Sequence, residues 1–190
     1  MKTFGIREAA AGLMLGAGSV GFVLGPFLAG LLADHSGPKT VFLAGLSAEV
    51  LLLAGFGLAP TFLVATLAFF LLNIAAGFIE TPVNIIPTMV AKDRPGPLMN
   101  IVHMFFSVGA FISPLLAGFI LQATGAWQPA FWLAAGLALV LALIFWRTPF
   151  PAQTETGVAE AKKAPVRLWT VLRERAILLG AIAMFLYVAA

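Results

Sequence analysis

The chain has 190 residues, of which 61% are hydrophobic and only 10% are charged, and its mean hydropathy is +1.03. A soluble domain carries about a quarter charged residues, so this composition excludes a water-soluble globular protein. We attribute the net charge of +3 to basic loops at a membrane surface rather than to a nucleic-acid-binding face. Cysteine is absent, which excludes disulfides, thiolate nucleophiles and Cys-ligated metals.

Continuous apolar runs predict an all-α, polytopic transmembrane helical bundle embedded in a lipid bilayer, because the strands of a β-barrel would alternate instead. About 20 residues are enough to cross the hydrocarbon core. Six spans are predicted, at residues 9–33, 41–59, 62–90, 98–121, 130–146 and 176–190. The sixth is shorter than a full span, so we expect a multi-pass protein of the cell membrane that is represented here by a fragment.

The basic residues orient these spans. Most of the 11 lysines and arginines lie in the loops after the first, third and fifth spans. By the positive-inside bias this side is cytoplasmic. Residue Met1 would then lie outside the cell, so we expect a further helix before it and more helices after Ala190 in the full-length protein.

The first span is rich in glycine, and its pairs Gly12/Gly16 and Gly21/Gly25 have the spacing that lets helix backbones approach closely in lipid. It ends in the pattern Gly30-x-Leu-Ala-Asp34-x-x-Gly37-x-Lys39. We expect a seven-residue polar turn at 34–40, with a left-handed conformation at Gly37 and a new helix from Pro38. The pattern resembles the loop signature between the second and third helices of the major facilitator superfamily (MFS). That resemblance implies that Gly30, Asp34, Gly37 and Lys39 belong to a loop that helps to lock the inward gate.

The same resemblance implies the domain organisation. Residues 1–146 correspond to helices two to six of a partial MFS fold, 147–175 to the cytoplasmic linker between its two halves, and 176–190 to the start of helix seven. In this interpretation the absent helices of the full-length transporter are the partners of the fragment.

The third span places polar residues in an apolar helix. Asn73, Gly77, Glu80 and Asn84 follow one another at steps of three or four and therefore share a face. A carboxylate at membrane depth is costly, so Glu80 is a candidate functional residue. The alternative is a polar seam between packed helices. Glu49 in the second span lacks polar companions at such spacing, and we give it a lesser role.

The fourth span repeats this pattern, because Asn100, His103 and Ser107 also share a face. A histidine at this position suits substrate binding, proton transfer or a structural hydrogen bond equally well. His35 lies in a loop and nothing supplies metal-ligand spacing, so we expect no metal site. No nucleophile–base–acid arrangement is present either, so we expect neither an enzyme nor a cofactor.

Together, Gly77-x-x-Glu80-Thr81-x-x-Asn84 and Asn100-x-x-His103-x-x-x-Ser107 resemble the fucose permease type of sugar:proton symporter within that superfamily. The resemblance implies that Glu80 binds the coupling proton and substrate. Substrate and proton binding are accordingly assigned to Glu80, Asn84, Asn73, Asn100 and His103. The function expected is proton-coupled uptake of a small polar solute, most plausibly a sugar, by alternating access of two helical halves.

Two other functions stay open. The pattern Gly109-x-x-x-Ser113-Pro114-x-x-Ala117-Gly118 is similar to the fifth-helix motif of proton-driven drug antiporters. Small residues at this spacing also serve close helix packing. A non-transporting membrane scaffold is the third possibility, since the polar faces need partners that the fragment lacks.

Overall fold

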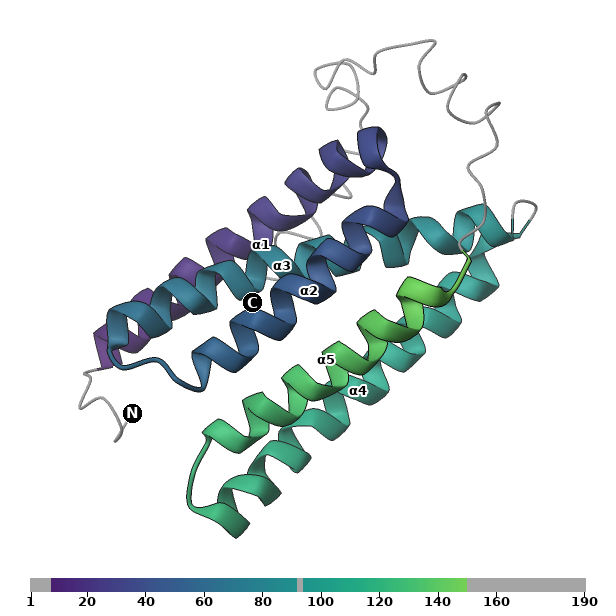
Figure 1. Ribbon diagram of the computed structural model, residues 1–190. Coiled ribbons are helices and arrows are strands. Elements are labelled where there is room, and N and C mark those ends of the chain that lie inside the picture. The colour runs from purple at the N-terminus through teal and green to yellow at the C-terminus, as the bar shows by residue number, and fades with distance from the viewer. Residues whose placement is uncertain (1–7, 92–93, 150–190) are drawn as a thin grey trace. The chain divides into compact units, whose positions relative to one another are not determined.

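The computed structural model describes residues 8–91 and 94–149, which form five helices (Figure 1). They are α1 (Glu8–Ser36), α2 (Pro38–Phe56), α3 (Phe62–Val90), α4 (Pro95–Thr124) and α5 (Gln128–Arg147). All five are long and apolar enough to cross a membrane. This confirms the all-α transmembrane prediction and the first five spans. Residues 150–175 of the predicted linker, 147–175, and the whole sixth span, 176–190, lie outside the described residues.

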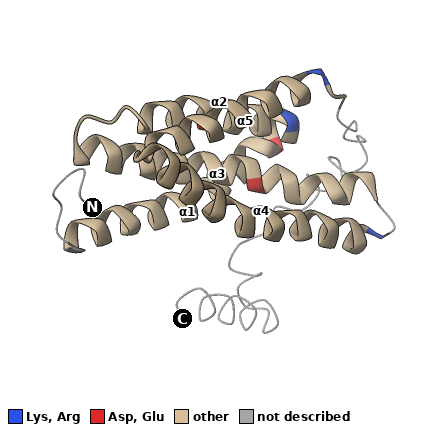
Figure 2. Cartoon of the chain, turned by 90° about the horizontal axis from the view of Figure 1, so that it is seen from below, with Lys and Arg blue, Asp and Glu red and all other residues tan. Residues whose placement is uncertain are grey.

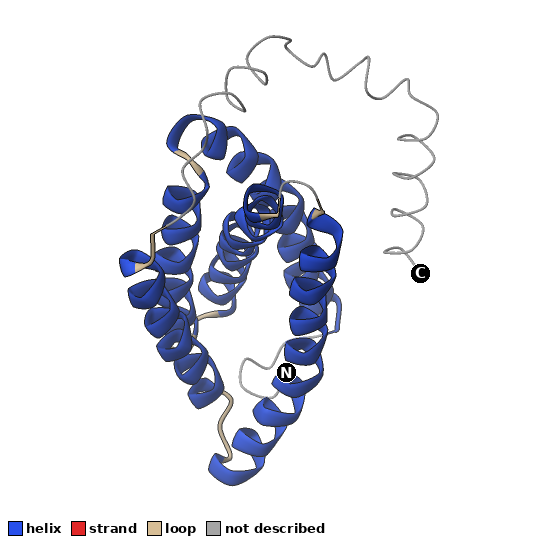
Figure 3. Ribbon diagram, turned by 90° about the vertical axis from the view of Figure 1, so that its right-hand side faces the viewer, coloured by secondary structure: helices blue, strands red, loops and turns tan. Residues whose placement is uncertain are grey.

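Short connections join the helices end to end (Figure 3), and specific residues set the boundaries. The expected seven-residue turn at 34–40 is wrong, because α1 runs to Ser36 and only Gly37 separates it from α2. The polar residues extend α1, with Ser36 Oγ donating to Leu32 O at 2.8 Å. Gly37 then takes a φ of 80°, which L side chains rarely adopt, and Pro38 begins α2.

The closest contact in the described bundle lies between α1 and α3, which cross through small residues. Gly21, Gly25, Ala29 and Ala33 are all buried on one face of α1. A Cβ added at Gly25 would lie 2.6 Å from the carbonyl oxygen of Ile74 on α3. The predicted close packing through Gly21 and Gly25 is therefore confirmed. The other predicted pair, Gly12 and Gly16, has nothing within 4 Å of an added Cβ.

Helix α2 lies between α3 and α5 and contacts both. Toward α3, a Cβ added at Gly45 would lie 2.8 Å from Cβ of Phe78. Toward α5, Phe42 meets Phe145 edge to face, with ring centroids 4.8 Å apart. Near the opposite end of α2, Phe56 packs on Phe131, with centroids 4.6 Å apart. These contacts anchor α5 at both ends, since aromatic pairs at this separation attract beyond their area burial.

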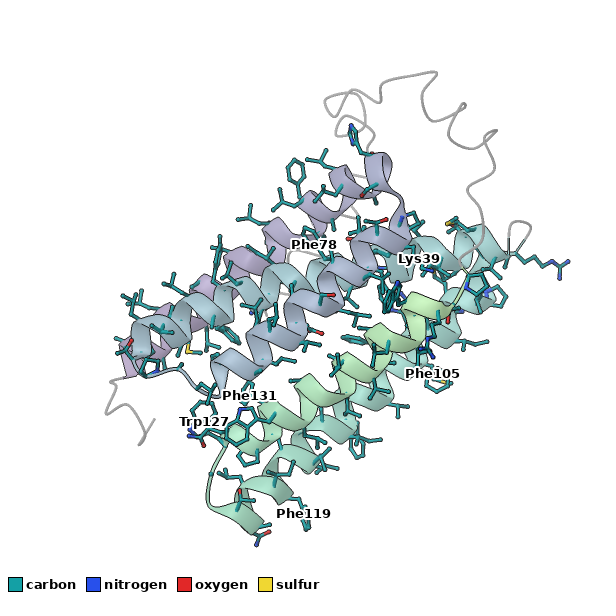
Figure 4. All side chains as sticks on the ribbon, viewed as in Figure 1. Lys39, Phe78, Phe105, Phe119, Trp127 and Phe131 are labelled. Atoms are coloured by element: carbon teal, nitrogen blue, oxygen red, sulfur yellow. The ribbon has the colours of Figure 1, made fainter. Side chains whose placement is uncertain are left out.

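Helix α4 is different, because none of its residues is buried in the described structure. Figure 4 shows Phe105 and Phe119 projecting outward from it, and their side chains are 66% and 68% exposed. The long apolar side chains on this helix are therefore available to lipid or to another helix.

We predict that Gly25→Ala destabilises the bundle, because the new Cβ would meet backbone atoms of α3 that cannot rotate away. Overpacking of this kind costs about 1–3 kcal/mol. Thermal unfolding of the purified protein in detergent should show a lower melting temperature. Gly16→Ala is the matched control on the same helix and should melt at or slightly above the wild-type temperature. Equal melting of the two variants would contradict the tight α1–α3 crossing.

Candidate functional site

Glu80 lies on the exposed side of α3 and makes no hydrogen bond or ion pair with any residue that the structure describes. One turn further along, Asn84 is half-buried. Pro82, between them, is fully buried, so it holds the opposite side of the helix against its neighbours. The carboxylate is thus presented by a helix that is packed on its other sides.

Asn73 has a different environment, because it lies in the contact between α1 and α3. Its Nδ2 donates to the carbonyl oxygen of Phe69 at 2.8 Å, within its own helix. A Cβ added at Gly18 of α1 would lie 3.0 Å from that same nitrogen. Gly77, the next residue on this face, packs directly on Gly25 and Pro26 of α1.

The predicted polar face of α3 is therefore divided between two environments. Asn73 and Gly77 lie in the seam between packed helices, whereas Glu80 is exposed and Asn84 half-buried beside it. The binding role given to Asn73 stays a prediction, and its surroundings match the alternative of a polar seam.

On α4, Asn100 and His103 are both exposed. No hydrogen bond links either side chain to α3 among the described residues. Ser107 Oγ donates to the carbonyl oxygen of His103 at 3.0 Å, so this hydroxyl is satisfied within the helix. Two polar side chains of α4 thus stand free to meet a solute or a further helix.

The residues of the predicted gating loop also differ in their environments. Lys39 donates from Nζ to the carbonyl oxygens of Trp146, at 3.2 Å, and Thr148, at 2.7 Å, at the C-terminal end of α5 (Figure 4). A cation at this end satisfies carbonyls that the helix leaves unpaired and opposes its dipole. Asp34, by contrast, is exposed and pairs with no described residue.

The contact of Lys39 with α5 was missed by sequence reasoning, because the partners are backbone atoms more than 100 positions away. Gly30, the first residue of the pattern, is half-buried with nothing within 4 Å of an added Cβ. The junction of α1 and α2 is therefore attached to α5 through Lys39, whereas Asp34 is exposed.

The described lysine and arginine residues lie toward one end of the helices, as the blue positions in Figure 2 show. They are Lys39, Arg94 and Arg147. The sequence places most basic residues in loops on one side of the membrane, and the described ones do lie at one end of the helices. The positive-inside bias predicts that this end is cytoplasmic. Within the described residues there is no group of three His, Asp or Glu side chains that holds a metal ion.

Compared with models of known protein families, the sequence matches the Major Facilitator Superfamily over residues 1–190. The chain belongs to that superfamily. With its apolar helices, this membership makes it a multi-pass membrane protein of the cell membrane.

Several MFS relatives carry names that state a solute. A putative niacin/nicotinamide transporter of Bacillus subtilis is 30% identical over 150 residues, covering 76% of this chain and 36% of that protein. The sodium-dependent glucose transporter 1A of Mus musculus is 32% identical over 102 residues, covering 52% of this chain and 23% of that protein. A niacin transporter of Acinetobacter baylyi is 26% identical over 151 residues, covering 78% of this chain and 34% of that protein. The chain thus spans about a quarter to a third of the length of these MFS relatives.

We predict that Lys39→Met loosens the end of α5. The variant keeps the aliphatic stem but loses both hydrogen bonds, and a hydrogen bond to a charged group contributes about 1.5–3 kcal/mol. Amide hydrogen exchange in the last turn of α5 should therefore become about tenfold faster or more. Arg94→Met removes a charge at the same end without a described partner and should leave this exchange rate unchanged. Equal exchange in both variants would show that Lys39 does not hold α5.

Proposed function

We propose that this chain is part of a secondary transporter that takes up a small polar solute of the sugar class together with protons, by alternating access. The observation that supports it is the exposed carboxylate of Glu80, which lies within a membrane-spanning helix and has no partner among the described residues. Membership of the MFS and the names of its relatives support the transporter class rather than an enzyme.

The free-energy cost of burying a charge would couple proton binding to the conformational change of the transporter. A charged carboxylate at the bilayer centre costs about 2.5–3.5 kcal/mol even on insertion scales. While the site is open to water, Glu80 is hydrated and the cost is small. When the helical halves close around the site, the water leaves, so the closed state favours the protonated, neutral acid. Protonation together with solute binding therefore permits the change between the outward-open and inward-open states, which is unfavourable for the charged, empty form.

Neutral hydrogen-bonding groups would bind the solute. Asn84, Asn100 and His103 offer amide and imidazole groups that donate to and accept from sugar hydroxyls. Asn73 has a more indirect part, because one of its donors is already used by Phe69. The proposed gate is the junction of α1 and α2 at residues 30–39, in which Asp34 would face the opposite half of the transporter while Lys39 fixes the junction to α5.

The domain organisation belongs to the same proposal. Residues 1–146 would supply helices two to six, 147–175 the cytoplasmic linker and 176–190 the start of helix seven of a complete transporter. The helices that the fragment lacks would complete the solute path.

A second candidate solute is a small aromatic acid of the nicotinate class. Two of the relatives named above are niacin transporters, and they match a larger share of this chain than the glucose transporter does. The glucose transporter is named as sodium-dependent, so sodium is the alternative coupling ion. Proton-driven drug export, suggested by the small residues of α4, differs in the direction of transport.

We predict that Glu80→Gln in the full-length protein abolishes proton-driven accumulation, because the amide is permanently neutral and carries no proton. Exchange of labelled for unlabelled solute should survive, since neutrality still permits the swing. Both are measured in proteoliposomes with and without an imposed pH gradient. Glu49→Gln is the control and should accumulate solute as the wild type does. Full accumulation by Glu80→Gln would rule out this residue as the proton carrier.

A second measurement on the same proteoliposomes identifies the solute and the coupling ion. We predict that a pH gradient, acidic outside, drives uptake of a labelled hexose at least tenfold above equilibration, and that a sodium gradient does not. Uptake of labelled nicotinate in its place would identify the second candidate. Extrusion of a cationic dye against its gradient would identify the antiporter.

A further inference from the structure

The contact between α2 and α5 has a fixed register along its length, and the two helices run side by side in Figure 1. Aromatic pairs set this register near both ends. Phe42 meets Phe145 with ring centroids 4.8 Å apart, and Phe56 meets Phe131 with centroids 4.6 Å apart. Phe56 follows Phe42 by as many residues as Phe145 follows Phe131, so the antiparallel helices keep the same register between the two pairs.

Glu49 and Ala138 lie at the same level, in the middle of this contact. Each is halfway between the two aromatic residues of its own helix, seven residues from both. Because residues seven apart lie on the same side of a helix, both belong to the faces that meet. Ala135 and Ala138 are the buried residues of α5, and Glu49 is half-buried. The side chain of Glu49 is therefore packed over the small residues of α5.

No residue of the facing helices compensates a negative charge at Glu49. Its side chain makes no hydrogen bond or ion pair within the described part of the chain. The titratable residue of α5 is Arg147, in the last turn of that helix. The titratable residue of α3 is Glu80, which is acidic as well.

The remaining charged groups near α2 lie at the helix ends. On α2 itself, Lys39 lies about 15 Å along the axis from Glu49, and it donates to carbonyl oxygens at the end of α5. The titratable residues of α1 are Glu8, Asp34 and His35, in its first and last turns. A carboxylate in the middle of the α2–α5 contact would thus have no cation beside it among the described residues.

The neutral acid is the form that suits this position. An unpaired carboxylate within a membrane-spanning contact is unfavourable, and protonation removes the charge. If the middle of the contact opens, water reaches the carboxyl group and the charged form becomes acceptable. The packed arrangement therefore binds the proton more tightly than the open arrangement does, so a rise in pH favours opening.

We propose that Glu49 is a second protonation site of this chain, which holds the middle of the α2–α5 contact together in its neutral form and opens it on losing its proton. The aromatic pairs keep the ends of the contact in register while the middle opens. This proposal is independent of the proposed transport function, because it concerns neither Glu80 nor a residue assigned to the solute.

Dicyclohexylcarbodiimide tests the protonation state of Glu49, since it dissolves in lipid and reacts with carboxylic acids that keep their proton. The acid proton moves to one carbodiimide nitrogen and the carboxyl oxygen bonds to the central carbon. The acyl group then moves from that oxygen to the other nitrogen, which leaves a stable N-acylurea with no atom lost. In native membranes at about pH 7, the full-length protein should carry this adduct at Glu49, located by mass spectrometry of its peptides. If Glu49 carries no adduct, the proposal fails.

Spin labels test the opening of the contact. The chain has no cysteine, so a pair can be introduced as Ser47→Cys and Val140→Cys, at exposed positions of α2 and α5, with any cysteine elsewhere in the full-length protein replaced. In proteoliposomes the distance between the labels should increase by several ångströms from about pH 6 to about pH 9. The same pair with Glu49→Gln is the control, and its distance should stay constant.

The control separates Glu49 from the other titrating groups, because Lys39 and Glu80 are present in both proteins. An equal increase in both proteins would assign the opening to another group and overturn the proposal. A distance that stays constant in both would overturn it as well, because the contact would then be insensitive to the charge of Glu49.

Discussion

The structure depends on the glycine-mediated approach of α1 to α3. Within a bilayer the lipid tails are as apolar as leucine, so helices associate through backbone proximity and packing rather than through exclusion of water. Gly21 and Gly25 remove the side chains that would hold the axes apart, and Gly77 does the same from α3. This crossing fixes the rotation of α3 about its own axis. The rotation in turn decides which of its polar residues are enclosed and which stay open.

The fixed rotation explains why one helical face serves two purposes. Asn73 and Gly77 are close enough to the crossing to be enclosed by α1, and the amide of Asn73 turns back to Phe69 O. Glu80 is exposed, although Phe78 and Ile85, before and after it on α3, pack against the cluster of Ala29, Ala33 and Val41. Asn73 is therefore part of the contact between α1 and α3, whereas Glu80 lies on a part of α3 that the described helices leave exposed. The polar residues of α3 are thus packed against α1 at Asn73 and exposed at Glu80.

The positions of the spans could be predicted from hydropathy, since length and apolarity alone decide whether a segment crosses a membrane. The ends were displaced by a few residues because Gly37 and Gly125 terminate helices through backbone geometry, which allows polar residues such as Ser36 to remain helical. Helical spacing also placed Asn73 and Glu80 on one face of the third span. Spacing predicts which residues of one helix share a face, but not which other helix packs on that face. Which neighbour covers a face, or which carbonyl Lys39 reaches, depends on packing between segments far apart in the sequence.

Two features of the described bundle are not covered by any described helix, the carboxylate of Glu80 and the small residues of α4. The carboxylate of Glu80 has no described partner, although an uncompensated charge facing lipid is costly. The small residues Gly109, Ser113 and Ala117 of α4 are exposed, and no described helix covers them. The helices α1, α2, α3 and α5 already satisfy one another through glycine and aromatic contacts. A carboxylate that no described helix covers is compatible with a membrane-spanning position only where water, a solute or another protein segment reaches it, and this is the condition on which the proposed coupling depends.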